Sequence, residues 1–241
     1  MVDFTHPAPP AQPAVPVTLG RTLRPAGDGV LSALPPGDEG APYDRRAAAY
    51  DRLVASPLYN RLLWRTSPRT YAAFAAEALH AGDGPLLDVA CGSGVFTAAA
   101  YRHADRPLVL ADRSLAMLGR ARGRLGLAAP EVSFMQADLF DLPFAAGAFE
   151  TVACHGALHV FDDLPEALRA LRAQLAPGGA LYVTSLVAET PVAALYLALL
   201  HRAGEVATPR RQADLLTFAR AELGDVTARR HGAMCFLTAR T

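Results

Sequence analysis

The chain has 241 residues and a formal net charge of zero, which fits one large domain and gives no sign of the basic surface that nucleic-acid binding needs. All 23 cationic Lys or Arg positions are arginine, so chemistry that requires a lysine amine is excluded. The three cysteines lie far apart without a paired spacing, which predicts no disulfide framework and no metal site and suits a cytoplasmic location.

The first 42 residues hold nine of the 19 prolines. This composition predicts a Pro-rich leader over residues 1–42 that is extended or disordered, without a secretory signal or a membrane span. An alternative is that the leader wraps over the fold or over a neighbouring subunit. We expect the folded domain to cover residues 43–241.

Helical periodicity from Arg45, broken at Ser56-Pro57 and resumed at Pro68, predicts an N-terminal helical cap over about residues 45–80. From residue 85 onward strands and helices then alternate. We expect strands at 85–90, 108–111, 132–135, 149–154 and 180–184, and helices at 95–103, after Ser114 and over 164–175. Such alternation indicates an α/β fold whose parallel sheet has helices on both faces.

The end of the chain departs from this alternation. Two helices, at 192–201 and 211–223, precede strands at 225–230 and 233–239 that are separated only by His231-Gly232. A connection this short cannot hold a parallel crossover, so the last two strands form an antiparallel pair. The sequence therefore predicts a Rossmann-like, seven-stranded, mostly parallel sheet.

The first strand of the alternating region runs through Asp88 into a short turn that contains Gly92 and Gly94. Glycines allow left-handed backbone and close approach of a ligand, and the following helix would direct its free N–H groups at the same space. We expect a small polar ligand there.

The residues around this turn resemble the class I S-adenosylmethionine-dependent methyltransferases, and are most similar to the small-molecule, methyltransferase type 11 branch that includes quinone-biosynthesis enzymes. The segments that carry the resemblance, in their expected order, are 88–94, 110–118, 136–144, 149–152, 158–159 and 175–179. The resemblance implies S-adenosyl-L-methionine as cofactor and a methyltransferase acting on a small molecule.

The same resemblance implies roles for single residues. Asp112 would accept hydrogen bonds from the ribose hydroxyls. The alternative is that its charge stabilises the N-terminus of the helix that Ser114 caps. Asp138 would accept from the adenine amino group beside the backbone N–H of Leu139, or instead cap its own loop. Arg113 could flank the adenine, as could Met117, which also fits the core. The implied cofactor-binding set is Tyr50, Asp88, Ala90, Cys91, Gly92, Gly94, Asp112, Arg113, Asp138, Leu139, Cys154 and His155.

Four of these assignments can be examined residue by residue. An unpaired Asp88 inside an apolar strand would be costly, and the resemblance implies partners for it in the turn amides and the cofactor's amino group, directly or through water. Ala90 stands where the family often has glycine and is small enough to be tolerated, and Cys91 is a small packing residue. Tyr50 would close over the methionine end of the cofactor, or simply pack.

Candidates for catalysis and for the acceptor pocket follow from the topology. His155, after the fourth strand of the alternating region, is the best-placed general base. For His159 the resemblance implies packing or hydrogen bonding under the sheet edge, and both histidines have a structural role as the alternative. The pocket would be roofed by the cap and by the segment after the fifth strand. Its candidate residues are Tyr59, Trp64, Arg65, Thr190 and Tyr196, and we expect the stripe Val192, Leu195 and Leu199 to be mostly core.

An apolar lid favours a hydrophobic or aromatic small molecule, and we expect neither a nucleic-acid nor a membrane partner, in a monomer or homodimer. A nicotinamide-dependent dehydrogenase is disfavoured, because Thr97 occupies the position of the third glycine in that fingerprint. A methyltransferase-fold protein that binds the cofactor but catalyses a cyclisation or rearrangement, or acts as a binding subunit, stays open.

Overall fold

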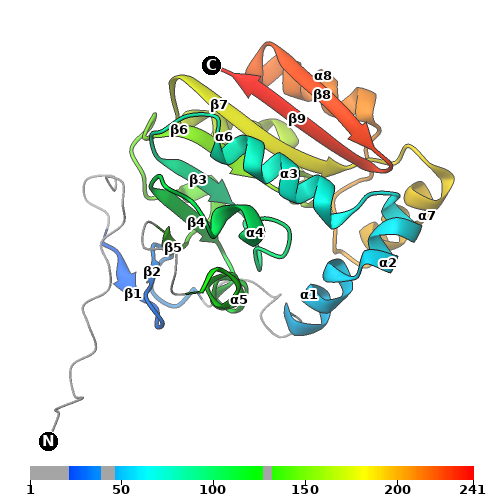
Figure 1. Cartoon of the computed structure of the whole chain (residues 1–241). Helices are drawn as coiled ribbons and strands as arrows, with labels where there is room; N and C mark the ends of the chain where they lie inside the picture. The colour runs from blue at the N-terminus through cyan, green and yellow to red at the C-terminus, as the bar shows by residue number, and fades with distance from the viewer. Residues whose placement is uncertain (1–21, 39–46, 127–131) are drawn as a thin grey trace, which may run out of the picture.

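The computed structural model describes residues 22–38, 47–126 and 132–241, without the side chains of residues 47–50. Within these residues it contains one nine-stranded sheet, in the order β1-β2-β5-β4-β3-β6-β7-β9-β8 (Figure 1). The strands are β1 (Arg24–Pro25), β2 (Val30–Ser32), β3 (Leu86–Val89), β4 (Leu108–Asp112), β5 (Val132–Gln136), β6 (Phe149–Cys154), β7 (Leu175–Leu186), β8 (Val226–His231) and β9 (Met234–Arg240).

The helices fall close to the ranges that the periodicity predicts. They are α1 (Ala47–Ala55), α2 (Pro57–Tyr59), α3 (Pro68–Leu79), α4 (Ala98–Tyr101), α5 (Leu115–Leu125), α6 (Leu164–Ala173), α7 (Pro191–Arg202) and α8 (Gln212–Leu223). A π-helix, η2 (Asn60–Trp64), follows α2, and two 3₁₀ turns, η3 (Leu139–Asp141) and η4 (Leu158–Val160), follow β5 and β6.

The sheet is mostly parallel, as predicted. Strands β2, β5, β4, β3, β6 and β7 are parallel neighbours, whereas β9 runs antiparallel to both β7 and β8. Because the central strands run in one direction, their carboxyl ends share one edge of the sheet, and the loops that follow them meet there. The α/β architecture and the antiparallel C-terminal pair are thus confirmed, with nine strands rather than seven.

The two additional strands correct the expectation that residues 1–42 form an extended or disordered leader. Within the described stretch 22–38, β1 and β2 form an antiparallel pair, and β2 adds to β5 in parallel. Residues 30–34 are buried, because a short apolar run sits between Gly29 and Pro35 and can cover the edge of the core. Residues 1–21 lie outside the described part of the chain.

Alternating strand side chains divide the core into two layers. Leu86 and Leu108 face α3, α4 and α5, while Leu87 and Val109 belong to the cluster with α6 and α8 on the other face. Period-2 alternation in strands that are covered on both faces gives this separation. Asp88 has the parity of Leu86 and therefore faces the layer that holds α4.

The cap closes the end of the sheet through a third apolar cluster. Trp64, Phe74, Leu197 and Phe236 pack there, so that η2, α3, α7 and β9 are joined. Figure 1 shows α2 and α7 at the right of the molecule, near the ends of β7 and β9, with α1 below them. Among the described helices, none is long and apolar enough to cross a membrane.

Candidate functional site

The glycine turn after β3 has an open, left-handed backbone. Ala90, Gly92 and Gly94 have φ of +53°, +57° and +65°. A Cβ built on Gly92 would meet nothing within 4 Å, so the turn presents bare backbone to open space. The turn continues to Thr97, and α4 begins only at Ala98, which makes the helix shorter than the predicted 95–103.

Asp112, at the end of β4, holds this turn in place. Its carboxylate accepts a hydrogen bond from the Gly92 N–H at 2.8 Å and another from the Ser114 N–H at 2.9 Å. Ser114 caps α5 as predicted, accepting from the Met117 N–H at 3.1 Å. Asp112 thus ties the glycine turn to the start of α5, and a carboxylate with four lone-pair sites can accept several hydrogen bonds at once.

Buried polar atoms without partners gather below the turn. Asp88 and Tyr101 are fully buried, and both carboxylate oxygens of Asp88, the Tyr101 hydroxyl and the Nε2 of His155 have no hydrogen-bond partner within the described part of the chain. The Tyr101 hydroxyl and the His155 backbone lie near enough to Asp88 to favour its charged form, but neither contact has full hydrogen-bond geometry. Orphaned polar groups of this kind are expensive, which marks the place as a ligand site.

The electrostatics of Asp88 agree with this reading. Burial raises the pKa of Asp88 to about 7, Tyr101 and the His155 backbone lower it, and the neighbouring charge of Asp112 raises it. A cationic ligand group would relieve the cost of the charged form. A strongly shifted carboxyl beside an open turn is a feature typical of functional sites.

His155 follows β6 and lies against the cap side of the core. Its ring meets Phe74 edge-on with centroids 5.6 Å apart, and burial lowers its pKa to about 4. An imidazole with so low a pKa is neutral at pH 7 and a weak proton acceptor. The structure therefore offers its Nε2 as a hydrogen-bonding atom, and its role as a catalytic base stays a prediction.

The loop after β5 contains an ion-pair network. Asp138 accepts a hydrogen bond from the Phe140 N–H at 3.0 Å and forms an ion pair with Arg113, which also pairs with Asp38 at 2.7 Å. The loop-capping role of Asp138 is thus present, and its adenine contact stays a prediction. Leu139 is buried at the start of η3. Asp38 was not foreseen, because it belongs to the segment expected to be a leader.

Cys91, Cys154 and Tyr50 are the remaining residues predicted to contact the cofactor. Cys91 and Cys154 are buried free thiols whose pKa values burial raises, which fits packing and makes them unreactive. Cys154 ends β6 beside Val183 of β7. Tyr50 lies in α1, but its side chain is outside the described residues.

An aromatic cluster joins the cap to α7. The hydroxyls of Tyr59 and Tyr196 hydrogen-bond at 3.2 Å, and Trp64 packs edge-on against both rings. Thr190 caps α7 by accepting from the Ala193 N–H at 3.1 Å, and Arg65 has left-handed backbone at the end of η2.

The stripe on α7 corrects the expectation of a core face. Val192, Leu195 and Leu199 are 48%, 66% and 50% exposed. The helix instead turns Ala193 and Leu197 inward, because those small and branched side chains fill the space against the aromatic cluster.

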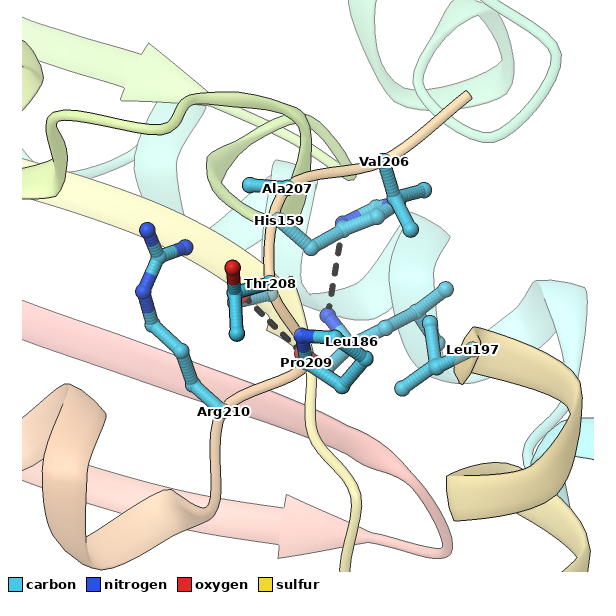
Figure 2. Close-up of a pocket in the computed structure, with 9 residues that line it drawn as sticks. His159, Leu186, Leu197, Val206, Ala207, Thr208, Pro209 and Arg210 are labelled. Carbon is cyan, nitrogen blue, oxygen red and sulfur yellow. Dashed lines mark hydrogen bonds between the residues drawn. The ribbon is translucent and has the colours of Figure 1, made fainter. Parts of the chain in front are cut away.

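A small hollow lies beside this region rather than over the glycine turn. Figure 2 shows His159, Leu186 and Leu197 around it, with the segment Val206–Arg210 passing across. The Leu186 N–H donates to the Nδ1 of His159 at 3.4 Å, and burial together with the charge of Arg210 lowers the pKa of this histidine to about 4. His159 therefore ties η4 to β7, the structural role that the sequence suggested.

Comparisons with known proteins point to one family. Residues 86–179 match the family model described as a methyltransferase domain. A demethylmenaquinone methyltransferase of Clavibacter sepedonicus is 33% identical over 150 residues, which cover 61% of this chain and 58% of that protein. The chain spans about half the length of the curated relatives it matches.

Solved structures share the fold at low identity. An O-methyltransferase family protein from Burkholderia thailandensis superposes with a TM-score of 0.64 at 19% identity, covering 81% of this chain and 59% of that one. The [4+2]-cyclase SpnF superposes with a TM-score of 0.63 at 18% identity, covering 83% and 93%. At these identities the likeness shows the fold alone.

Proposed function

We propose that this chain, which carries a class I S-adenosylmethionine-dependent methyltransferase domain, transfers the cofactor's methyl group to a small apolar or aromatic acceptor. The observation that carries the proposal is the fully buried, unpaired carboxylate of Asp88 beneath the open glycine turn. A buried carboxylate in this position needs a cationic or N–H donor partner, and the amino group of S-adenosylmethionine is one.

The described residues fit the other parts of the cofactor as well. Asp112, at the carboxyl end of β4, would accept hydrogen bonds from the ribose hydroxyls, and Asp138, just after β5, would accept one from the adenine amino group. Gly92 lets the backbone approach the ligand, because no side chain fills the space in front of it. S-adenosylmethionine supplies an activated methyl group on its sulfonium, and methyl transfer to a nucleophile leaves S-adenosylhomocysteine.

The protein's own contribution to such a transfer is alignment. Asp88 would fix the methionine end of the donor and Asp112 its ribose, and the cap would exclude water from the acceptor side. His155 would accept or donate a hydrogen bond at Nε2 near the acceptor. Its low pKa favours an acceptor that loses its proton to solvent, or one that is already ionised, over full proton transfer to the imidazole.

The acceptor class is inferred from the cap. Tyr59, Trp64 and Tyr196 form an aromatic wall between η2 and α7, which suits a flat or apolar molecule. Relatives whose names specify quinone methylation support the same class. The neutral net charge argues against a nucleic-acid substrate, and three free cysteines suit the cytoplasm.

The reaction is tested by incubating the full chain with methyl-labelled S-adenosylmethionine and a panel of phenols, quinols and amines. We expect S-adenosylhomocysteine and a methylated product from at least one acceptor of the first two classes. Cofactor binding by calorimetry without any methylated product would favour the alternative, a cyclisation, a rearrangement or a binding subunit. The observation that motivates this alternative is the similarity in fold to the cyclase SpnF.

Replacement of Asp88 by asparagine distinguishes the effect of the buried carboxylate on folding stability from its effect on cofactor binding. Because its pKa is raised from 3.8 to about 7, the Asp88→Asn variant should stabilise the free protein at pH 8 by up to about 4 kcal/mol. It should also weaken S-adenosylhomocysteine binding at least about tenfold, since a charged partner is lost. Urea unfolding and calorimetry measure the two effects.

The matched control is Asp225→Asn, because Asp225 is exposed at the start of β8. We expect this control to change neither quantity. An Asp88→Asn protein that binds S-adenosylhomocysteine as tightly as the parent would contradict the assignment of Asp88 to the cofactor.

A further inference from the structure

Asp51 is a carboxylate of the cap that reaches the glycine turn. It lies on α1 and is 3% exposed. One of its oxygens accepts a hydrogen bond from the Ser93 hydroxyl, and the other pairs with Arg124 at 2.6 Å and with Arg120 at 3.5 Å. A helix that precedes the first parallel strand of the alternating region is thereby tied to the turn that follows that strand.

Arg124 makes the same connection from the opposite side. Besides its pair with Asp51, it donates to the backbone carbonyl of Ser93 at 2.9 Å. Ser93 is therefore held at its side chain by Asp51 and at its main chain by Arg124. We call Asp51, Ser93 and Arg124 the Asp51 latch.

Ser93 lies between two glycines, so contacts to it help to fix the shape of the turn. Its two neighbours, Gly92 and Gly94, both have left-handed backbone, and glycine adopts many other conformations at similar cost. The shape of the turn must then be fixed by contacts from outside it. Asp112 fixes Gly92 from the sheet side, and the latch fixes Ser93 from the cap side.

The charges of the latch are well balanced. Burial on its own would raise the pKa of Asp51, but hydrogen bonds from Arg124 and Ser93 and the charges of both arginines hold it below its usual value. A carboxylate that stays charged at 3% exposure depends on these partners, and removing it would leave Arg124 without its buried counter-ion.

We propose that Asp51 is a positioning residue for the donor site, because it joins the cap helix α1 to the glycine turn and so sets the shape of the cofactor cradle. The identity of the ligand rests on the proposed function, whereas the coupling of α1 to the turn rests on the contacts alone. The cap is then part of cofactor binding as well as a cover for the acceptor.

The test compares Asp51→Asn, which keeps the shape and removes the charge, with the parent and with Glu77→Gln. Glu77 is a matched control, because it lies on another helix, α3, and its carboxylate makes an exposed ion pair with Arg229 of β8. The ligand is S-adenosylhomocysteine, measured by calorimetry. Hydrogen exchange of residues 91–97 and 47–55 is followed in the free protein.

For Asp51→Asn we expect binding weaker by about tenfold or more, since a hydrogen bond to a charged group is lost. Exchange should rise in both segments of the free variant, and saturating ligand should restore protection of 91–97. With an acceptor in hand, KM for S-adenosylmethionine should rise while kcat at saturation stays within about twofold. Glu77→Gln should match the parent throughout.

A second variant, Arg124→Gln, approaches the latch from α5, and the double variant should bind no more weakly than the weaker single one. The proposal is overturned if Asp51→Asn binds like the parent with unchanged exchange, or if exchange rises equally over the whole sheet. A parent protein that fails to bind S-adenosylhomocysteine would refute the proposed function, and the exchange of the two segments would still decide the latch.

Discussion

Ala90 shows at the scale of one residue why side-chain size is the wrong criterion in this turn. The sequence suggests that alanine replaces a glycine harmlessly because it is small. The structure gives Ala90 a φ of +53°, which is left-handed backbone that a residue with a Cβ adopts at a cost. The turn therefore holds strain that its glycines at 92 and 94 avoid.

Ala90→Gly should stabilise the protein by about 0.5–1 kcal/mol, because relief of about 1–2 kcal/mol of left-handed strain exceeds the added entropy of an unfolded glycine. Denaturant unfolding measures the difference. Ala90→Val serves as the opposite control and should destabilise, since a β-branched residue fits left-handed backbone worse. A loss of stability in Ala90→Gly would show that the alanine methyl contributes packing that outweighs the strain.

At the scale of elements, the hairpin of β8 and β9 anchors the cap. Its turn residue Gly232 has a φ of +61°, and a Cβ there would collide with the carbonyl oxygen of Trp64. The Ala233 N–H donates to the same carbonyl at 2.7 Å, and the Val187 N–H donates to the Ala233 carbonyl at 2.8 Å. Three elements, η2, β7 and the hairpin, thus meet through main-chain atoms.

Gly232→Ala should destabilise the protein by about 3 kcal/mol, combining left-handed strain with a clash against backbone that cannot move aside easily. Gly204→Ala is the matched control, since Gly204 has a φ of +72° but nothing within 4 Å of a built Cβ. That control should cost about 1–2 kcal/mol from strain alone. Urea midpoints give both values, and equal losses would refute the close contact with Trp64.

At the scale of the whole molecule, the fully buried Asp88 and the partly buried His155 and His159 set the response to pH. Burial raises the pKa of Asp88 to about 7, and lowers those of His155 and His159 to about 4. Between pH 4 and about 6.5 the unfolded chain binds more protons at the two histidines, which favours the native state as pH rises. Between about pH 4 and 7 the native state binds more protons at Asp88 than the unfolded chain does. This group therefore lowers the free energy of unfolding as pH rises.

From about pH 4 to about 6.5 the two histidines outweigh Asp88 by one proton, so the free energy of unfolding should rise by about 1.4 kcal/mol per pH unit. Above about pH 6.5 only Asp88 still titrates, and the free energy of unfolding should fall slightly toward about pH 7.5. Urea unfolding across this range measures it. In Asp88→Asn the fall above about pH 6.5 should vanish and the rise below it should steepen, because only the histidines remain. A flat profile would contradict the shifted pKa values of these three groups.

Much of this architecture could be predicted because the relevant signals are local. The strand–turn–helix around Gly92, the cap at Ser114 and the two-residue hairpin connection each follow from residues adjacent in sequence. Strands β1 and β2 were missed because nine prolines by residue 42 dominate the composition. The signal that could have found β2 is the apolar run at residues 30–34 between a glycine and two prolines.

The candidate site was predictable only in part, since its partners come from distant segments. Asp88, Gly92 and Asp112 stand at strand ends, where topology alone places them. The contacts of Asp38 with Arg113 and of Asp51 with Ser93 depend on how the N-terminal segment crosses the sheet edge, which no short pattern encodes. Exposure of Leu195 likewise follows from which side of α7 the aromatic cluster occupies.

The same N-terminal segment also determines where the sheet stops. Within the described residues the outermost strands are β1, which is two residues long and contains Pro25, and β8, which carries Arg229 and Arg230. Proline removes a ladder donor, and charged side chains on a border strand repel a neighbour that would add to it. Both borders are therefore poor templates for further strand addition, so this large sheet is protected against self-templated aggregation.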